Sequence, residues 1–126
     1  MDDWNRTMRC NGLDRDLLAQ LAESHGLNAR VFSLLRLQLL QGLAALGPDG
    51  ATYRELKAAL EVSDGALYAN LKALTAMGYL EPEKVSVENK ELESYRITSA
   101  GAGEWERVRD WLCRFCECGG DRRAEP

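Results

Sequence analysis

Three cysteines lie within six residues near the end of the chain, in the sequence CRFCEC, and a fourth lies near its start. The C-x-x-C spacing of Cys113 and Cys116 places two sulfurs on one helical face, close enough to share a metal or to form a strained disulfide. With Cys118 and one further ligand, the set suits zinc or an iron–sulfur cluster. The further ligand is Cys10 or a cysteine of a second chain. The alternative is that these cysteines are small apolar side chains that only pack beside aromatic neighbours.

The rest of the composition excludes several classes of function. The chain has no phosphate-binding glycine loop, nucleophile elbow or dinucleotide fingerprint, so we do not expect an enzyme. Its 20 acidic and 16 basic side chains argue against a polybasic nucleic-acid binder, but they leave room for a local basic patch. Arg36, Gln38 and Gln41 interrupt the longest leucine-rich segment, so no membrane span is predicted. The initial MDD lacks the positive region of a secretory signal, and we expect a cytoplasmic protein with reduced thiols.

The segment from Thr52 to Gly78 has the pattern of two short helices joined by a tight turn at Glu61-Val62. Thr52 and Glu55 have the spacing of a capping box, which predicts the start of the first helix. Ser63 is a suitable N-cap for the second helix, and Gly78 is a suitable residue to end it. The apolar positions at helical spacing are Leu56, Ala59 and Leu60 in the first helix and Leu67, Leu71 and Leu74 in the second. The second helix of such a pair is the one that enters a DNA major groove.

The rest of the chain predicts further helices and one hairpin, so the fold is mainly α with a small β hairpin. We expect one domain with a flexible N-terminus (1–12), N-terminal helices (13–46), the helix-turn-helix (52–78), a hairpin or wing (79–97), a C-terminal helix (98–118) and a loose tail (119–126). The second N-terminal helix is predicted from Asn28 to Leu46. The hairpin turn is predicted at Glu88-Asn89-Lys90-Glu91, and the Gly119-Gly120 pair is predicted to end the last helix.

Three stretches carry a resemblance to a known family. They are RLQLLQGLAALG (36–47), VSDGALYANLKALTAMGYLE (62–81) and YRITSAG (95–101). Together they resemble the winged helix-turn-helix transcriptional regulators, in particular the ArsR/MarR-like group of small single-domain winged helix DNA-binding proteins. The similarity covers residues 36–111, about 60% of the chain, with its elements in the expected order. It implies a DNA-binding regulator of transcription that acts as a homodimer.

The same resemblance assigns DNA-contacting positions to the helix-turn-helix. It places the groove-facing side of the second helix at Ser63, Asp64, Ala66, Tyr68, Ala69 and Lys72. A tyrosine there touches a phosphate or a thymine methyl, and a lysine pairs with a phosphate or a guanine. Ser63 or Thr52 is placed to donate to a phosphate at a helix N-terminus. Asp64 is better explained by a favourable interaction with the helix dipole than by base recognition. Arg54, Lys57 and Lys72 of both subunits would form the positive stripe of a DNA-binding dimer.

The predicted wing is acidic. Between residues 81 and 96 its carboxylates are Glu81, Glu83, Glu88, Glu91 and Glu93, and its cations are Lys84, Lys90 and Arg96. The cations Lys90 and Arg96 are the wing residues expected to approach DNA, yet five carboxylates against three cations would repel it. Three interpretations follow: weak DNA binding, binding with the wing held off the duplex, or a winged helix that recognises a protein instead.

The terminal helices carry more apolar surface than a small domain easily hides, which favours a homodimer. The residues predicted to form the dimer interface are Leu17, Leu21, Leu35, Trp105, Val108, Trp111, Leu112 and Phe115. The alternative is that these apolar stripes pack against each other within one chain.

Overall fold

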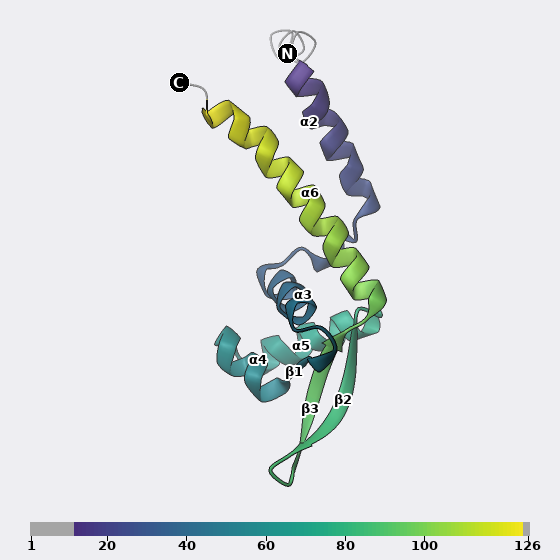
Figure 1. Cartoon of the computed structure of the whole chain (residues 1–126), viewed down its shortest axis with the longest axis vertical. Helices are drawn as coiled ribbons and strands as arrows, with labels where there is room; N and C mark the ends of the chain where they lie inside the picture. Colours follow the sequence, from purple (N-terminus) through teal and green to yellow (C-terminus); the bar gives the residue numbers. More distant parts are fainter. Residues whose placement is uncertain (1–11, 125–126) are drawn as a thin grey trace. The chain divides into compact units, whose positions relative to one another are not determined.

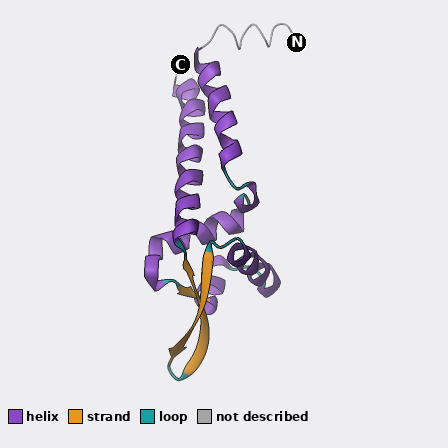
Figure 2. Cartoon of the chain, turned by 90° about the vertical axis from the view of Figure 1, so that its right-hand side faces the viewer, coloured by secondary structure: helices purple, strands orange, loops and turns teal. Residues whose placement is uncertain are grey.

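The computed structural model describes residues 12–124, which are mostly helical, with one small antiparallel sheet (Figures 1 and 2). This confirms the predicted fold class. The described residues fall into two compact units, one formed by 12–28 with 106–124 and the other by 29–105. The expectation of a single domain over the whole chain stays a prediction. None of the helices within residues 12–124 is long and apolar enough to cross a lipid bilayer.

The larger unit contains the helix-turn-helix, formed by α4 (Tyr53–Leu60) and α5 (Asp64–Ala76). The predicted capping box is confirmed, because the Thr52 hydroxyl accepts the Glu55 N–H at 3.1 Å and the Glu55 carboxylate accepts the Thr52 N–H at 2.9 Å. Glu61 adopts a left-handed conformation (φ 52°) and reverses the chain between the helices. The Ser63 side chain then caps α5 by accepting the Ala66 N–H at 3.1 Å, also as predicted.

Gly78 ends α5 in the way that its sequence position predicts. It has φ +83°, and its N–H donates to the Thr75 carbonyl while the next N–H, of Tyr79, donates to the Leu74 carbonyl. This pair of hydrogen bonds is a Schellman motif, which needs a residue with positive φ. The same turn is tied to the end of the hairpin, because the Thr98 hydroxyl donates to the Gly78 carbonyl at 2.6 Å and the Thr98 N–H donates to the Tyr79 carbonyl at 2.9 Å.

The sheet has the strand order β1-β3-β2, with β1 at Ala51–Thr52, β2 at Leu80–Val87 and β3 at Lys90–Ile97. Strands β2 and β3 form the predicted wing, and Leu80 pairs with Ile97 at its base. The predicted four-residue turn is wrong, since β3 already begins at Lys90. Glu88 and Asn89 both have positive φ, 52° and 65°, and this two-residue turn matches the twist of the strands. The short strand β1 was not predicted.

Helix α6 spans Ser99–Ala124. Thr98 caps its start, as its hydroxyl accepts the Gly101 N–H at 3.1 Å. The two early glycines suggest a weak helix start, but Gly101 is there for space: a Cβ on it would lie 2.9 Å from Ile97 Cγ1 and against the Tyr79 carbonyl. The predicted end at Gly119-Gly120 is also wrong, because the helix continues through both glycines. Glycine costs about 1 kcal/mol in a helix and does not forbid it.

The leucine-rich helix α3 spans Leu34–Leu46 and begins six residues later than the predicted Asn28. Its N-cap is Ser33, whose side chain accepts the Arg36 N–H at 3.2 Å, and only a 3-10 turn, η2 (Ala29–Val31), precedes it. The predicted glycine-proline loop forms a further 3-10 turn, η3 (Gly47–Asp49). The buried apolar residues of the larger unit are Val31, Leu39, Leu40, Leu43, Ala51, Leu56, Leu67, Leu71, Leu74, Leu80 and Tyr95.

The smaller unit pairs α2 (Gly12–Glu23), followed by the 3-10 turn η1 (Ser24–Gly26), with residues 106–124 of α6. Gln20 is 5% exposed and joins the two helices, because its amide donates to the Trp111 carbonyl at 2.9 Å and its own carbonyl accepts the Trp111 indole N–H at 2.7 Å. Arg114 adds hydrogen bonds to Gln20 and to Glu23. The Trp111 ring stacks on Phe115 with centroids 5.0 Å apart.

Candidate nucleic-acid interface

Helix α5 has one face in the core and the opposite face in solvent. Its three core leucines, at 67, 71 and 74, have no exposed surface, whereas Tyr68 is 53% exposed. Of the residues predicted to face the groove, Ser63, Asp64, Tyr68, Ala69 and Lys72 are exposed and Ala66 is half-buried. The Lys72 Nζ lies over the Tyr68 ring, 5.8 Å from its centroid, so the cation and the aromatic ring are in contact on the exposed face.

Asn70, also on α5, makes its hydrogen bonds inside the protein. Its amide donates to the Ala66 carbonyl at 2.7 Å, and its side-chain oxygen accepts a hydrogen bond from Arg36 Nε at 2.8 Å. The Arg36 guanidinium also donates to the Arg30 carbonyl. Arg36 therefore fixes α5 against α3, a role that its place in the leucine-rich helix does not reveal.

The N-terminus of α5 is tied to α4 through Asp64. The Lys57 Nζ lies 2.8 Å from Asp64 Oδ2, and the Tyr53 hydroxyl donates to Asp64 Oδ1 at 2.9 Å. The hydrogen bond from Lys57, followed by that from Tyr53, holds the pKa of the Asp64 carboxyl below its usual range. Partial burial, followed by the hydrogen bond to Asp64, raises the pKa of Tyr53. The predicted helix-dipole role of Asp64 thus comes with two partners that sequence spacing did not suggest.

Arg54 and Thr52, the predicted DNA contacts at the start of α4, differ in whether their side chains are free to contact DNA. Arg54 is exposed. Thr52 is half-buried, and its hydroxyl donates to Glu55 Oε1 at 3.0 Å, so its proton is used within the capping box rather than offered to a phosphate. The Thr52 N–H, followed by the Thr52 hydroxyl, lowers the pKa of Glu55.

One cation of the wing is paired with two carboxylates. The Arg96 guanidinium lies 3.2 Å from Glu81 Oε2 and 3.6 Å from Glu83 Oε2, so this cation is balanced by two carboxylates. Lys90, at the start of β3, is exposed. Of the two cations expected to approach DNA from the wing, Arg96 is therefore already paired inside the protein.

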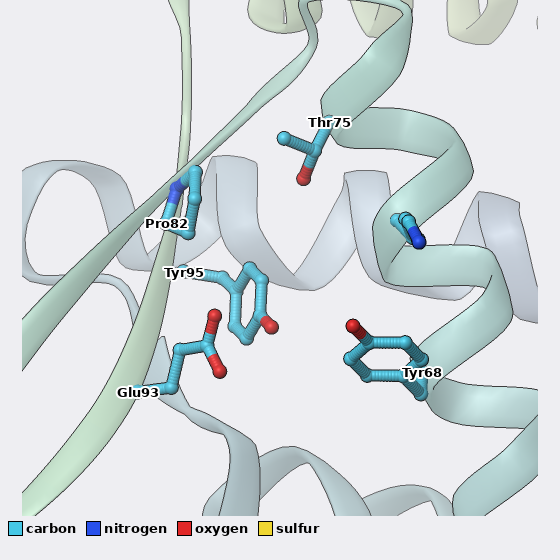
Figure 3. Close-up of a pocket in the computed structure, with 6 residues that line it drawn as sticks. Tyr68, Thr75, Pro82, Glu93 and Tyr95 are labelled. Atoms are coloured by element: carbon cyan, nitrogen blue, oxygen red, sulfur yellow. The ribbon is translucent and has the colours of Figure 1, made fainter.

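A small cavity of about 130 Å³ separates α5 from the wing. Figure 3 shows Tyr68 and Thr75 of α5 on one side, with Pro82, Glu93 and Tyr95 of the strands on the other. Tyr95 is 4% exposed, and burial, followed by the Glu93 carboxylate, raises its pKa to about 12. The cavity therefore brings the Glu93 carboxylate and the buried Tyr95 ring close to Tyr68 and Lys72 on the exposed face of α5.

The predicted thiol cluster lies only partly among the described residues. Cys113 and Cys116 are exposed free thiols on α6. Cys10 and the side chain of Cys118 lie outside the described residues. Among the side chains that the structure describes, no group of three or more His, Cys, Asp or Glu could hold a metal ion.

The residues predicted at a dimer interface have mixed exposure. Leu21 is 43% and Phe115 39% exposed, and Leu18, which was not predicted, is 46% exposed. Val108 is buried. The half-buried members of the set are Leu17, Leu35, Trp105, Trp111 and Leu112.

Comparison with known proteins assigns this architecture to a family. The chain belongs to the winged helix DNA-binding domain family, which matches residues 35–116. This is a family of DNA-binding regulators and not a class of enzymes. No sequence among the curated proteins matches the chain.

Solved structures share the fold at low sequence identity. The DNA complex of MepR from Staphylococcus aureus has a TM-score of 0.62 at 14% identity, with 86% of this chain and 83% of that chain covered. A PadR family transcriptional regulator from Eggerthella lenta has a TM-score of 0.58 at 20% identity, covering 78% and 92%. The protein smu.1704 of Streptococcus mutans has a TM-score of 0.58 at 17% identity, covering 75% and 92%. The winged helix-turn-helix assignment is confirmed, whereas the ArsR/MarR-like subgroup is a looser description.

Proposed function

We propose that this protein is a transcriptional regulator that binds double-stranded DNA, with α5 in the major groove. One observation carries the proposal: α5 buries its leucines and presents Tyr68 and Lys72 to solvent beside a capped helix N-terminus. These groups suit phosphate and base contacts. The winged helix family and a structural neighbour solved in complex with DNA support it. A cytoplasmic location, where such a regulator meets DNA, is part of the proposal.

Fluorescence polarisation with a labelled duplex tests DNA binding. Because each neutralised phosphate releases counterions, the logarithm of the association constant should fall linearly as the logarithm of salt concentration rises. Lys90→Gln serves as a probe of the wing, since this exposed cation lies at the tip of the hairpin. An affinity that stays flat between low and moderate salt would argue against phosphate contacts and against the proposal.

We infer that the protein acts as a homodimer through its terminal helices. Exposed apolar side chains on α2 and α6, namely Leu18, Leu21 and Phe115, support this, because water-exposed leucine and phenylalanine favour a partner surface. Symmetric dimers also let two recognition helices read two half-sites about one turn apart. Light scattering should give twice the chain mass at micromolar concentration, and Leu21→Gln should shift it toward the monomer. A wild-type monomer at that concentration would refute the inference.

A second candidate function is a protein-recognition winged helix that does not bind DNA. The observation that favours it is the wing, where Arg96 is balanced by Glu81 and Glu83. Replacing both glutamates with glutamine separates the possibilities. If the wing approaches DNA, this variant should bind a duplex more tightly. If the wing is held off the duplex, the affinity should stay unchanged. If neither the wild type nor the variant binds DNA with a salt-dependent affinity, the result would favour the protein-recognition function.

We also propose that the cysteines make the regulator responsive to a metal or to an oxidant. The exposed thiols of Cys113 and Cys116, three positions apart on α6, support this, and Cys10 and Cys118 would complete a set of four. Elemental analysis of anaerobically purified protein tests the metal version. Zinc or iron that is lost in Cys116→Ser would support it. If no metal is found but the thiols of the wild type are protected, the redox version would remain. Absence of both metal and thiol protection would refute the proposal.

A further inference from the structure

The carboxylate of Asp64 lies where an anion would be expected to bind. Asp64 is the first residue of α5, directly after its N-cap, and both of its oxygens meet donors from α4. Oδ2 lies 2.8 Å from Lys57 Nζ, and Oδ1 accepts the Tyr53 hydroxyl at 2.9 Å. A lysine, a tyrosine hydroxyl and a helix N-terminus are groups that bind DNA phosphates.

The position of these donors fits a contact with the DNA backbone. In a helix-turn-helix, the first helix crosses the backbone while the N-terminal residues of the second helix meet the bases. Lys57 and Tyr53 belong to the first helix, α4, and point to the start of the second. We propose that Lys57 and Tyr53 form a phosphate-binding position that Asp64 occupies in the free protein, so that Asp64 lowers the affinity for DNA of any sequence. This inference rests on the proposed DNA-binding function.

A purely structural role for the pair explains less. The side chains of Lys57 and Asp64 are 42% and 68% exposed, and ion pairs so open to water add little stability. The start of α5 is already secured by Ser63, which accepts the Ala66 N–H. The exposure that limits the stabilising value of the pair also leaves Lys57 accessible to a phosphate once its carboxylate partner is removed or displaced.

The experiment measures the affinity of the full chain for a labelled random-sequence duplex over a range of salt concentrations. The variants are Asp64→Asn, Lys57→Gln and the double variant. Glu61→Gln is the matched control, because it removes one exposed carboxylate from the same turn region without releasing Lys57. Asp64→Ser gives a second test with a residue that is well tolerated at a helix start.

The expected result is a several-fold gain in affinity for Asp64→Asn and Asp64→Ser that exceeds the gain for Glu61→Gln. The slope of log K against log salt should steepen by about 0.9, the value for one additional phosphate contact. The gain should be clearly smaller in the Lys57→Gln background. An equal gain in affinity from Asp64→Asn with and without Lys57→Gln would overturn the proposal, and so would a gain no larger than that of Glu61→Gln. Either result would mean that Asp64 affects DNA binding only through the net charge of the protein.

The same titrations separate this inference from the proposed function. If the wild type binds DNA with a salt-dependent affinity and Asp64→Asn behaves like Glu61→Gln, only the role of Asp64 fails. If neither the wild type nor any variant shows salt-dependent binding, DNA binding itself fails and the inference fails with it. Circular dichroism of each variant at the assay temperature confirms that the compared proteins are folded.

Discussion

The close approach at the start of α6 leads to a prediction about Gly101→Ala. A Cβ at this position would lie 2.9 Å from Ile97 Cγ1 and 3.0 Å from the Tyr79 carbonyl carbon, with the carbonyl oxygen closer still. That carbonyl accepts the Thr98 N–H at 2.9 Å, so it is held by the base of the wing and does not move freely. The added methyl must displace backbone, and such overpacking costs about 1–3 kcal/mol.

Gly42→Ala is the matched control for this change. Gly42 also lies inside a helix, α3, but a Cβ there meets nothing within 4 Å. Without a clash, alanine should stabilise the helix by roughly 0.5–1 kcal/mol. The two substitutions therefore add the same methyl group to two helices and are expected to act in opposite directions.

Urea unfolding monitored by circular dichroism measures both effects. Gly101→Ala should lower the midpoint and the free energy of unfolding, whereas Gly42→Ala should raise both at an unchanged slope. A Gly101→Ala protein as stable as Gly42→Ala would show that the contact between α6, Tyr79 and Ile97 is looser than described. It would also contradict the conclusion that this position requires glycine because of its contact with Tyr79 and Ile97.

Three further predictions concern the cap, the buried tyrosine and the exposed helix face. Thr52→Ala should lower the free energy of unfolding by about 1 kcal/mol in the same assay, because it removes the hydroxyl acceptor of the capping box. Burial and Glu93 raise the pKa of Tyr95 from 10.0 to about 12, so the neutral phenol contributes stability that is complete below pH 10 and lost as pH rises toward 12. Tyr95→Phe should flatten the fall in stability over that window, and an unchanged fall would assign it to other groups. If Lys72 contacts a phosphate, Lys72→Gln should weaken binding to all duplexes and reduce the salt slope by about 0.9. An unchanged slope in the polarisation assay would remove Lys72 from the interface.

The helix-turn-helix was predictable because its signals are local. The Thr52–Glu55 box, the Ser63 cap and the Gly78 ending each depend on residues within one turn of a helix. The side chains of Thr52, Glu55 and Ser63 accept backbone N–H groups three residues away, and glycine permits the positive φ of Gly78, so sequence spacing alone specifies the geometry. The burial of the α5 leucines follows in the same way from their helical period.

Several features that the sequence did not predict depend on residues far apart in the chain. Strand β1 has two residues, and it exists because Ala51 pairs with Tyr95 across 44 positions of sequence. The reason for Gly101 lies in its contact with Tyr79, and the hydrogen bonds between Gln20 and Trp111 join opposite ends of the chain. No local pattern encodes such contacts, since a glutamine or a glycine alone is compatible with many environments.

Some charges of the candidate interface were predictable from the sequence, whereas their pairing was not. An acidic wing and a lysine on α5 are visible in the composition, but the pairing of Asp64 with Lys57 and of Arg96 with Glu81 requires the folded geometry. These pairs lower the affinity for DNA that the charge count alone would suggest. Two cations that a count of charges treats as available to phosphates have carboxylate partners inside the protein.

Selection of bound duplexes from a random-sequence pool tests whether α5 recognises specific bases. If α5 reads bases as part of a symmetric dimer, the recovered sequences should share a motif repeated as an inverted pair, with half-sites about one helical turn apart. The Tyr68→Ala protein should lose the enrichment at one position of each half-site while keeping its salt-dependent binding. Recovery of no motif above the unselected pool by the wild-type protein would contradict sequence-specific recognition through this helix.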